Sequence, residues 1–183
     1  MICQFSADGD KPTLGDLYKF PGDVYPVGRL DTDSEGLLIL TNDKSLNNRL
    51  LNPNHKHNRT YFSQVEGNIS TRELDILSTG IIITVDGKSY KTLPAKAEKL
   101  MNDPELPDRI PSIRVRKAIP TSWIKLTLCE GKNRQVRKMT ASVGFPTLRL
   151  IRISIEGLNI EGMIPGEVRE INKELLFQQL FSI

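Results

Sequence analysis

Short segments in which apolar and polar residues alternate constrain the fold of this chain more than any other feature. Between residues 122 and 129, Ile124, Leu126 and Leu128 occupy every second position, and the two residues between them are polar. Residues 147–155 alternate in a similar way. A period of two places the apolar residues on one face of a β-strand, which then needs a second layer to cover it. The chain is therefore predicted to be an α+β protein with a mixed, mostly antiparallel central sheet flanked by helices.

The same patterns predict the other elements and the turns that join them. Asp86-Gly87 has the composition of a hairpin turn. Residues 102–111 contain three prolines and are predicted to form a loop, a candidate hinge or lid. Capping residues and apolar spacing predict helices at residues 43–51, 70–80, 133–143 and 172–181. Further strands are predicted at residues 37–41, 60–67, 81–85 and 93–100.

Length and composition narrow the class of protein. The chain has 183 residues, which predicts one domain or two small ones, and 38% of them are hydrophobic, enough for a real core. Its longest apolar run, residues 37–40, is too short to span a bilayer or to form a signal-peptide core, so we expect a cytoplasmic protein with no membrane partner. Cys3 and Cys129 match no metal-ligand spacing and are expected to be reduced. His55 and His57 have no metal-ligating partners nearby, so no metal site is expected.

Positive charge is concentrated in one part of the chain. Residues 109–152 contain eleven basic residues and a single acidic one, Glu130, although the net charge of the whole chain is only +3. The remainder is therefore acidic. A strongly positive segment on a near-neutral protein predicts a polyanionic partner. A solvated surface is the alternative interpretation, although inert surfaces usually mix both signs.

An acidic loop at residues 27–42 is the first candidate site. It carries Asp31, Asp33 and Glu35 between glycines, directly before an apolar run. A carboxylate at the mouth of a buried strand is well placed for catalysis. A structural acidic turn and a pair of acid/base carboxylates, as in glycosidases, are the alternatives. A calcium loop is disfavoured because its twelfth position is Asn42, which cannot supply a bidentate carboxylate.

Two further segments have the residue types of an RNA site. Alternation predicts that Tyr61 lies on one face of its strand, where it is either structural or able to stack on a nucleobase. In residues 130–139, Arg134, Arg137 and Lys138 share one helical face. The helix N-terminus adds free N–H groups and a positive dipole end to this face. Phosphate contacts of this kind are independent of base sequence and weaken with salt.

Taken together and in this order, these segments resemble bacterial pseudouridine synthases of the RsuA family. The similarity runs from about residue 24 to 171, and the segment Arg59-Thr60-Tyr61 has arginine where the family's K-x-Y strand commonly has lysine. Pro120-Thr121-Ser122-Trp123, followed by residues 144–152, is most similar to the RluE branch, which modifies 23S ribosomal RNA. The three segments that carry the family resemblance are residues 28–43, 59–61 and 130–139.

The resemblance implies a pseudouridine synthase catalytic core. We expect a single catalytic domain over residues 1–183, which can comprise two subdomains around an active-site cleft. Only residues 2–5 remain of the family's usual first strand, so the N-terminus is expected to be truncated, and no S4 domain precedes the core. The isomerisation needs no cofactor and no metal. No obligate protein partner is evident, and a monomer is the expected state.

The resemblance also implies roles for individual residues. Asp31 is the essential carboxylate, Arg137 its salt-bridge partner, and Tyr61 the aromatic that stacks on uracil and can take part in the final proton removal. Attack on the ribose or base and proton abstraction from C2′ to give a glycal are both compatible with Asp31. The residues expected to contact RNA are Arg29, Lys132, Asn133, Arg134, Gln135, Lys138, Arg149 and Arg152.

Two other functions would account for part of the pattern. A non-catalytic RNA- or ribosome-binding module explains the basic segment but leaves Asp31 and Tyr61 without a task. A metal-dependent nuclease would use the acidic loop and would require a divalent ion. The interpretation as a pseudouridine synthase uses all three segments, and it is therefore the leading hypothesis.

Overall fold

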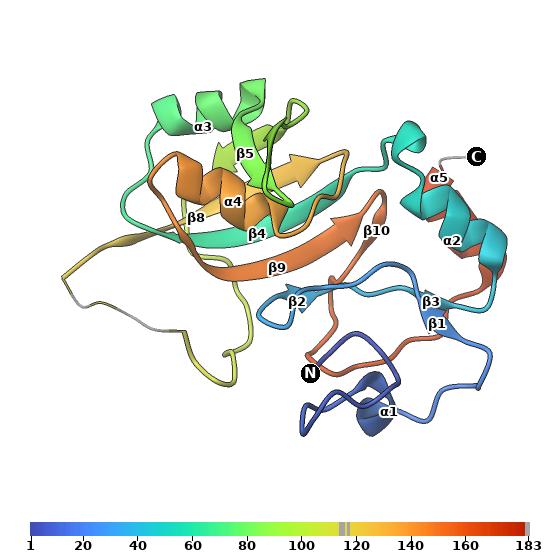
Figure 1. Cartoon of the computed structure of the whole chain (residues 1–183). Helices are drawn as coiled ribbons and strands as arrows, with labels where there is room; N and C mark the ends of the chain where they lie inside the picture. Colours follow the sequence, from blue (N-terminus) through green and yellow to red (C-terminus); the bar gives the residue numbers. More distant parts are fainter. Residues whose placement is uncertain (114–115, 117, 182–183) are drawn as a thin grey trace.

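A six-stranded, mostly antiparallel sheet organises the computed structural model, which describes residues 1–113, 116 and 118–181. The strands lie in the order β10-β9-β4-β8-β7, and β2 joins the edge of β9 as a parallel neighbour (Figure 1). The alternation predicted at residues 147–155 corresponds to β9, and the prediction of an α+β fold with a mostly antiparallel sheet is confirmed. The strands of this sheet are β2 (Glu35–Gly36), β4 (Arg59–Glu66), β7 (Lys96–Lys99), β8 (Thr121–Leu128), β9 (Thr147–Ile155) and β10 (Leu158–Asn159).

One face of this sheet is covered by helices α3 (Thr71–Thr79) and α4 (Gln135–Ser142), together with the hairpin β5–β6 (Figure 1). Leu77, Ile124 and Met139 meet in the main core and are each fully buried. The predicted hairpin turn is confirmed, because Asp86 and Gly87 both have positive φ. The hairpin strands are β5 (Ile82–Val85) and β6 (Lys88–Lys91).

A second core cluster lies at the other end of the sheet. Helices α2 (Lys44–Leu51) and α5 (Lys173–Phe181) contribute Leu46, Leu50 and Leu180 to it, and Ile155 joins from the end of β9. The strand β9 also supplies Leu150 to the main core, so one strand connects the two clusters. The remaining elements are α1 (Leu14–Leu17), β1 (Tyr25–Pro26), β3 (Leu40–Thr41) and η1 (Pro53–His55).

The predicted helix starts at Asp43, Ser70 and Asn172 are confirmed by hydrogen bonds. A side-chain oxygen of Asp43 accepts from the backbone N–H groups of residues 45 and 46, at 2.8 and 3.2 Å. Ser70 and Glu73 form the predicted capping box, and the side chain of Asn172 accepts from the first turn of α5. Each cap satisfies N–H groups that have no partner inside the helix.

The single strand predicted at residues 37–41 is wrong. The chain instead pairs with β9 at Gly36, leaves the sheet, and pairs with β1 at Leu40 and Thr41. Leu37 and Ile39 are buried as the apolar pattern predicts, but burial alone does not keep a segment in one sheet. The helix predicted from residue 133 begins at Gln135, and the strand predicted at residues 93–100 covers only Lys96–Lys99.

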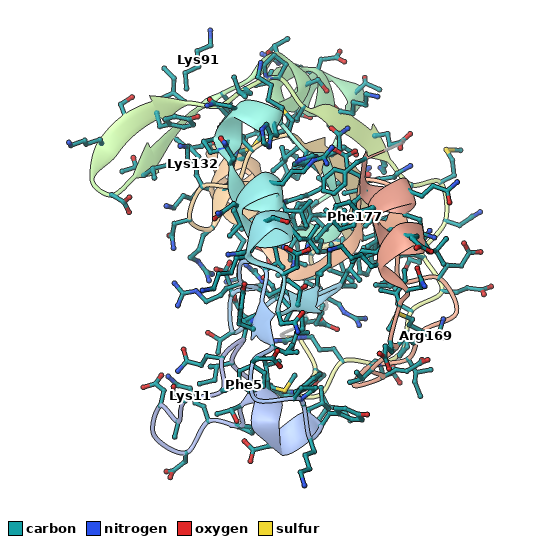
Figure 2. All side chains as sticks on the ribbon, turned by 90° about the vertical axis from the view of Figure 1, so that its right-hand side faces the viewer. Phe5, Lys11, Lys91, Lys132, Arg169 and Phe177 are labelled. Carbon is teal, nitrogen blue, oxygen red and sulfur yellow. The ribbon has the colours of Figure 1, made fainter. Side chains whose placement is uncertain are left out.

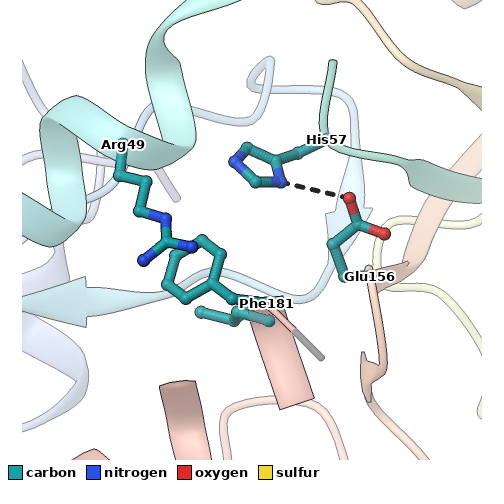
Figure 3. Close-up of a pocket in the computed structure, with 5 residues that line it drawn as sticks. Arg49, His57, Glu156 and Phe181 are labelled. Carbon is teal, nitrogen blue, oxygen red and sulfur yellow. Dashed lines mark hydrogen bonds and ion pairs between the residues drawn. The ribbon is translucent and has the colours of Figure 1, made fainter. Parts of the chain in front are cut away.

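A pocket of about 250 Å³ lies at the corner where α2, the start of β4 and α5 meet (Figure 3). There His57 Nδ1 lies 3.1 Å from a carboxylate oxygen of Glu156, and the Arg49 guanidinium lies 3.5 Å from the centre of the Phe181 ring. The first contact joins the segment before β4 to the turn after β9, and the second joins α5 to α2. Within the described ranges, no helix is long and apolar enough to cross a membrane, and no three His, Cys, Asp or Glu side chains are grouped as metal ligands.

Candidate active site

Asp31 lies in a tight loop that leads into β2. The backbone N–H of Ser34 donates to the Asp31 carbonyl at 2.9 Å, which closes the turn. After the loop, Gly36 pairs with Arg152, and the N–H of Leu37 donates to the Arg152 carbonyl at 2.8 Å. Main-chain hydrogen bonds to β9 therefore fix the end of the loop. The Asp31 side chain is 30% exposed to solvent.

Gly36 makes this close approach to β9 geometrically feasible. Its φ is +107°, in the region that favours glycine, and a Cβ atom there would lie 2.2 Å from the carbonyl oxygen of Arg152. Any larger residue would push the acidic loop away from the sheet. Gly36 therefore contributes to the site by letting the backbone of the acidic loop lie close to β9.

Among the described arginines, Arg134 is the one that lies within ion-pair distance of the Asp31 carboxylate. Its two terminal nitrogens each lie 2.9 Å from an oxygen of Asp33, in a bidentate pair, and one of them lies 3.6 Å from Asp31 Oδ2. The hydrogen bonds from Arg134 lower the pKa of Asp33, with a further contribution from the charge of Arg137. The site thus holds two neighbouring carboxylates beside one guanidinium that is 42% exposed.

The expected salt bridge between Arg137 and Asp31 is wrong. Arg137 Nη2 donates to the main-chain carbonyl of Asp33 at 2.7 Å and lies 3.5 Å from the Asp33 carboxylate. Its other terminal nitrogen donates to the Thr147 carbonyl at 3.4 Å. Its side chain is only 11% exposed, and burial lowers its pKa. Arg137 therefore braces the acidic loop against β9, while Arg134, at the exposed start of α4, reaches Asp31.

The structure places Tyr61 on β4, directly opposite Arg152 on β9. Tyr61 is half-buried and packs against the main core, on the face of the sheet predicted from the alternation. Asp31 and Tyr61 both approach this part of β9, one through the loop before β2 and the other through β4.

Two residues predicted to contact RNA are buried, and those predictions are wrong. Arg152 is 5% exposed, and its Nε donates to the Leu37 carbonyl at 2.8 Å. Gln135 is 4% exposed, donates to Glu130 at 2.6 Å, and accepts from the Lys132 N–H at 2.9 Å. Both side chains are held inside the protein by these hydrogen bonds, and neither can reach a phosphate group.

The remaining candidate RNA contacts are distributed around the acidic loop and the start of α4. Arg29, Lys132 and Asn133 are exposed, and Lys138 is half-buried. Figure 2 places Lys132 near the end of the molecule that carries Lys91, opposite the end that carries Lys11. Of the basic segment predicted from the sequence, Arg114 and Lys117 lie outside the described residues.

Sequence reasoning missed the cluster around Glu35. Arg149 donates to both Glu35 oxygens, at 3.0 and 2.8 Å, and Arg109 lies 3.1 Å from one of them. Arg149 also donates to the Pro107 carbonyl, so the cluster holds the predicted loop at residues 102–111 against the sheet. A recess of about 570 Å³, lined in part by Gln64 and both arginines, lies beside it. The sequence signal that could have indicated this cluster was the placement of Asp31, Asp33 and Glu35 at every second position, which gives Glu35 a place in the same acidic loop.

Comparisons with known proteins give the family. Residues 3–142 match the family model for RNA pseudouridylate synthase. The chain belongs to this family. The pseudouridine synthase resemblance predicted from the three segments is therefore confirmed, and the protein is an enzyme that isomerises uridine in RNA. Nothing in the comparisons favours a non-catalytic RNA-binding module.

Relatives of this pseudouridine synthase share most of its length. A ribosomal large subunit pseudouridine synthase E from Vibrio vulnificus is 45% identical over 171 residues, 93% of this chain and 70% of the relative. One from Xanthomonas campestris is 46% identical over 171 residues, 92% of this chain and 89% of the relative. A crystal structure of a pseudouridylate synthase superposes with a TM-score of 0.77 at 26% identity, covering 98% of this chain and 68% of the other.

Proposed function

We propose that this pseudouridine synthase acts on ribosomal RNA of the large subunit, with Asp31 as the carboxylate at the reacting nucleotide. The substrate is supported by the two relatives named above, which are similar over more than nine-tenths of this chain. Ribosomal RNA as substrate implies the cytoplasm as the compartment. One catalytic domain accounts for the activity, since β9 contributes to both core clusters.

The reaction rearranges bonds within one nucleotide. The N1–C1′ bond breaks, a C5–C1′ bond forms, C5 loses a proton and N1 gains one, so atoms and electrons balance without a redox step. Attack by the carboxylate and abstraction of the C2′ proton both require Asp31 to be ionised. Arg134, 3.6 Å away, supplies a neighbouring positive charge. This contact at a half-buried carboxylate in the family's motif is the observation that carries the proposal.

The target base must leave its RNA helix to reach Asp31. Extruding a base costs roughly a few kcal/mol, because its stacking on the neighbouring bases is lost. Arg29, two positions before Asp31 and exposed, is the residue proposed to occupy the vacated space or to bind a flanking phosphate. Lys132 and Lys138 are the proposed phosphate contacts, and Tyr61 is the proposed stacking partner of the uracil.

The proposed role of Asp31 can be tested by tritium release from ribosomal RNA labelled at C5 of uridine, because the isomerisation expels this hydrogen. We expect Asp31→Asn to lower turnover by at least about 10²–10⁴-fold while RNA retention on filters changes little. Asp75→Asn, on the exposed side of α3, is the matched control and should retain full turnover. Wild-type activity in Asp31→Asn, or RNA binding by the wild type without tritium release, would overturn the proposal.

A further inference from the structure

The recess beside Glu35 is a cavity that the proposed chemistry at Asp31 does not use. It has a volume of about 570 Å³ and is lined by side chains of β4, β9 and residues 108–113. Arg149, on β9, donates to both Glu35 oxygens and to the Pro107 carbonyl, so three hydrogen bonds fix the wall that joins the sheet to this segment. A recess with a fixed wall has the properties of a preformed binding site.

The recess adjoins the site at Asp31. Glu35 belongs to the same acidic loop as Asp31, and Arg109, which lines the recess, lies 3.1 Å from a Glu35 oxygen. The positive charge of Arg109 also acts on Arg137, where it adds to the effect of burial in lowering the pKa of that guanidinium. In Figure 1 the segment between β7 and β8 and the acidic loop both lie on the side of β9 away from α3. A group bound in the recess is therefore close to the nucleotide at Asp31.

The charges around the recess balance, which disfavours a phosphate group as its ligand. Arg109 and Arg149 line it, but Glu35 forms ion pairs with both of them. The Asp108 carboxylate lines the recess as well. A phosphate bound there would meet the negative charge of Asp108 beside arginines that are already paired. The recess therefore favours an uncharged ligand that donates hydrogen bonds.

The polar and apolar groups of the recess fit a nucleobase. The Asp108 carboxylate accepts hydrogen bonds. Gln64 donates through Nε2 to the Thr121 hydroxyl at 3.1 Å, and among the described residues no donor is bonded to its carbonyl oxygen. Ile110 is 94% exposed and Ile113 is partly buried, and a flat base can pack on such apolar side chains. Acceptors beside an apolar surface match a base with an exocyclic amino group, which guanine, adenine and cytosine have and uracil lacks.

We propose that this recess binds one unpaired nucleobase near the target uridine in the RNA, and that Asp108 and Gln64 accept hydrogen bonds from its amino group. The inference rests on the proposed function, because it adds sequence specificity to the same reaction at Asp31. The exposed lysines near the start of α4 do not supply this specificity, since phosphate contacts carry no sequence information. A base held in the recess instead determines which uridine is presented to the acidic loop.

The test uses fragments of large-subunit ribosomal RNA labelled with tritium only at the uridine that the wild type modifies. Each flanking nucleotide is replaced in turn by uridine, and kcat/KM is measured by tritium release. We expect replacement at one flanking position to lower kcat/KM of the wild type by about 10–100-fold. Asp108→Asn and Gln64→Met should lose most of this difference, because they act less well on the original base and equally well on the replaced one. Asp103→Asn, exposed on the same segment and outside the recess, is the control and should keep the full difference.

The outcomes separate this inference from the proposed function. If the wild type and Asp103→Asn release no tritium from ribosomal RNA, the proposed function fails. If the wild type is active but no flanking replacement lowers kcat/KM, or Asp108→Asn and Gln64→Met lower it equally for all fragments, the recess does not read a base and the inference is overturned. Inhibition of the wild type by free guanosine or cytidine monophosphate that disappears in Asp108→Asn would assign the recess to a free nucleotide and would also overturn it. Asp108 is exposed, so its substitution should leave the fold intact, which circular dichroism verifies.

Discussion

At the scale of residues, each carboxylate of the acidic loop has a different set of arginines. Asp33 takes the bidentate pair with Arg134, and Glu35 takes a bidentate pair with Arg149. Among the described residues, the Asp31 carboxylate has a single ion-pair contact, with Arg134 at 3.6 Å. A carboxylate held only loosely keeps its lone pairs for a substrate, whereas its neighbours are committed to holding the loop.

The ion pair of Asp33 predicts a dependence of stability on pH. Arg134 lowers the folded-state pKa of Asp33 below its unfolded value of about 3.9. Its stabilisation is therefore complete above that unfolded value and is lost as the pH falls through the lower, folded one. Asp33→Asn should lower the melting temperature at pH 7, and the difference from wild type should shrink toward pH 3. A difference that stays constant in thermal melts would contradict this assignment.

Gly36 should tolerate no side chain. Alanine there would be strained at φ +107° and would meet the Arg152 carbonyl, so we expect Gly36→Ala to lower the free energy of unfolding by at least about 2 kcal/mol. Gly22→Ala is the control, because a Cβ atom at that position would meet nothing within 4 Å and the backbone φ there is ordinary. Urea denaturation of both variants measures the contrast, and equal losses would mean that the β2–β9 contact is loose.

At the scale of elements, Glu130 joins the start of α4 to the hairpin β5–β6. It is buried and accepts hydrogen bonds from the Tyr90 hydroxyl, the Leu93 N–H and Gln135, at 2.5, 2.9 and 2.6 Å. The hydrogen bond to Glu130 raises the pKa of Tyr90 to about 12. This connection sets where α4 begins, and so it sets where Arg134 can reach.

Helix α3 offers a matched pair for the packing of the main core. Leu77 is fully buried, whereas its neighbour Ile76 is 40% exposed. Leu77→Ala should lower the free energy of unfolding by about 2–5 kcal/mol, because it opens a cavity among well-packed side chains. Ile76→Ala should cost under about 0.5 kcal/mol. Chemical denaturation checks both, and similar costs would show that α3 does not seal the sheet.

Most elements were predictable because local patterns decide them. The alternation in β9, the caps at Asp43 and Asn172 and the Asp86-Gly87 turn each act within a few residues of chain. The burial of Arg152 was not predictable, because it depends on β2 covering the edge of β9. A sequence shows that a residue is basic, but not which strand will be placed over it.

The choice between Arg134 and Arg137 was hidden for a related reason. Their spacing predicts one helical face, but Arg134 has a left-handed φ of +52° and precedes the helix. The helix begins after Arg134 because Gln135 is held by Glu130, which also binds the Leu93 N–H. Long-range contacts of this kind leave no periodic signal in the sequence.

At the scale of the whole molecule, the positive segment is less available to a polyanion than its composition indicates. Arg109 and Arg149 share Glu35, Arg134 binds Asp33, and Arg152 is buried. The charges left for phosphate groups are fewer than the eleven counted in the sequence. RNA affinity should therefore depend on a few exposed side chains near the start of α4.

Salt dependence measures how many of these charges contact phosphate. Lys132→Ala should weaken binding to RNAs of different sequence by a similar factor and reduce the slope of log K against log salt by about 1. Lys11→Ala is the control, because Lys11 already pairs with Asp8 and lies at the opposite end of the molecule (Figure 2). Filter binding at salt concentrations from about 50 to about 200 mM distinguishes the two variants. An unchanged slope for Lys132→Ala would remove it from the interface.

The parallel contact between β2 and β9 has a consequence for biosynthesis. It joins Leu37 to Arg152 across 115 positions, and the pair of Arg134 with Asp33 spans 101. A nascent chain emerging from the ribosome tunnel holds the acidic loop long before it holds the strand that shapes it. Catalytic competence must therefore arise late in translation, as one event, after β9 has been synthesised.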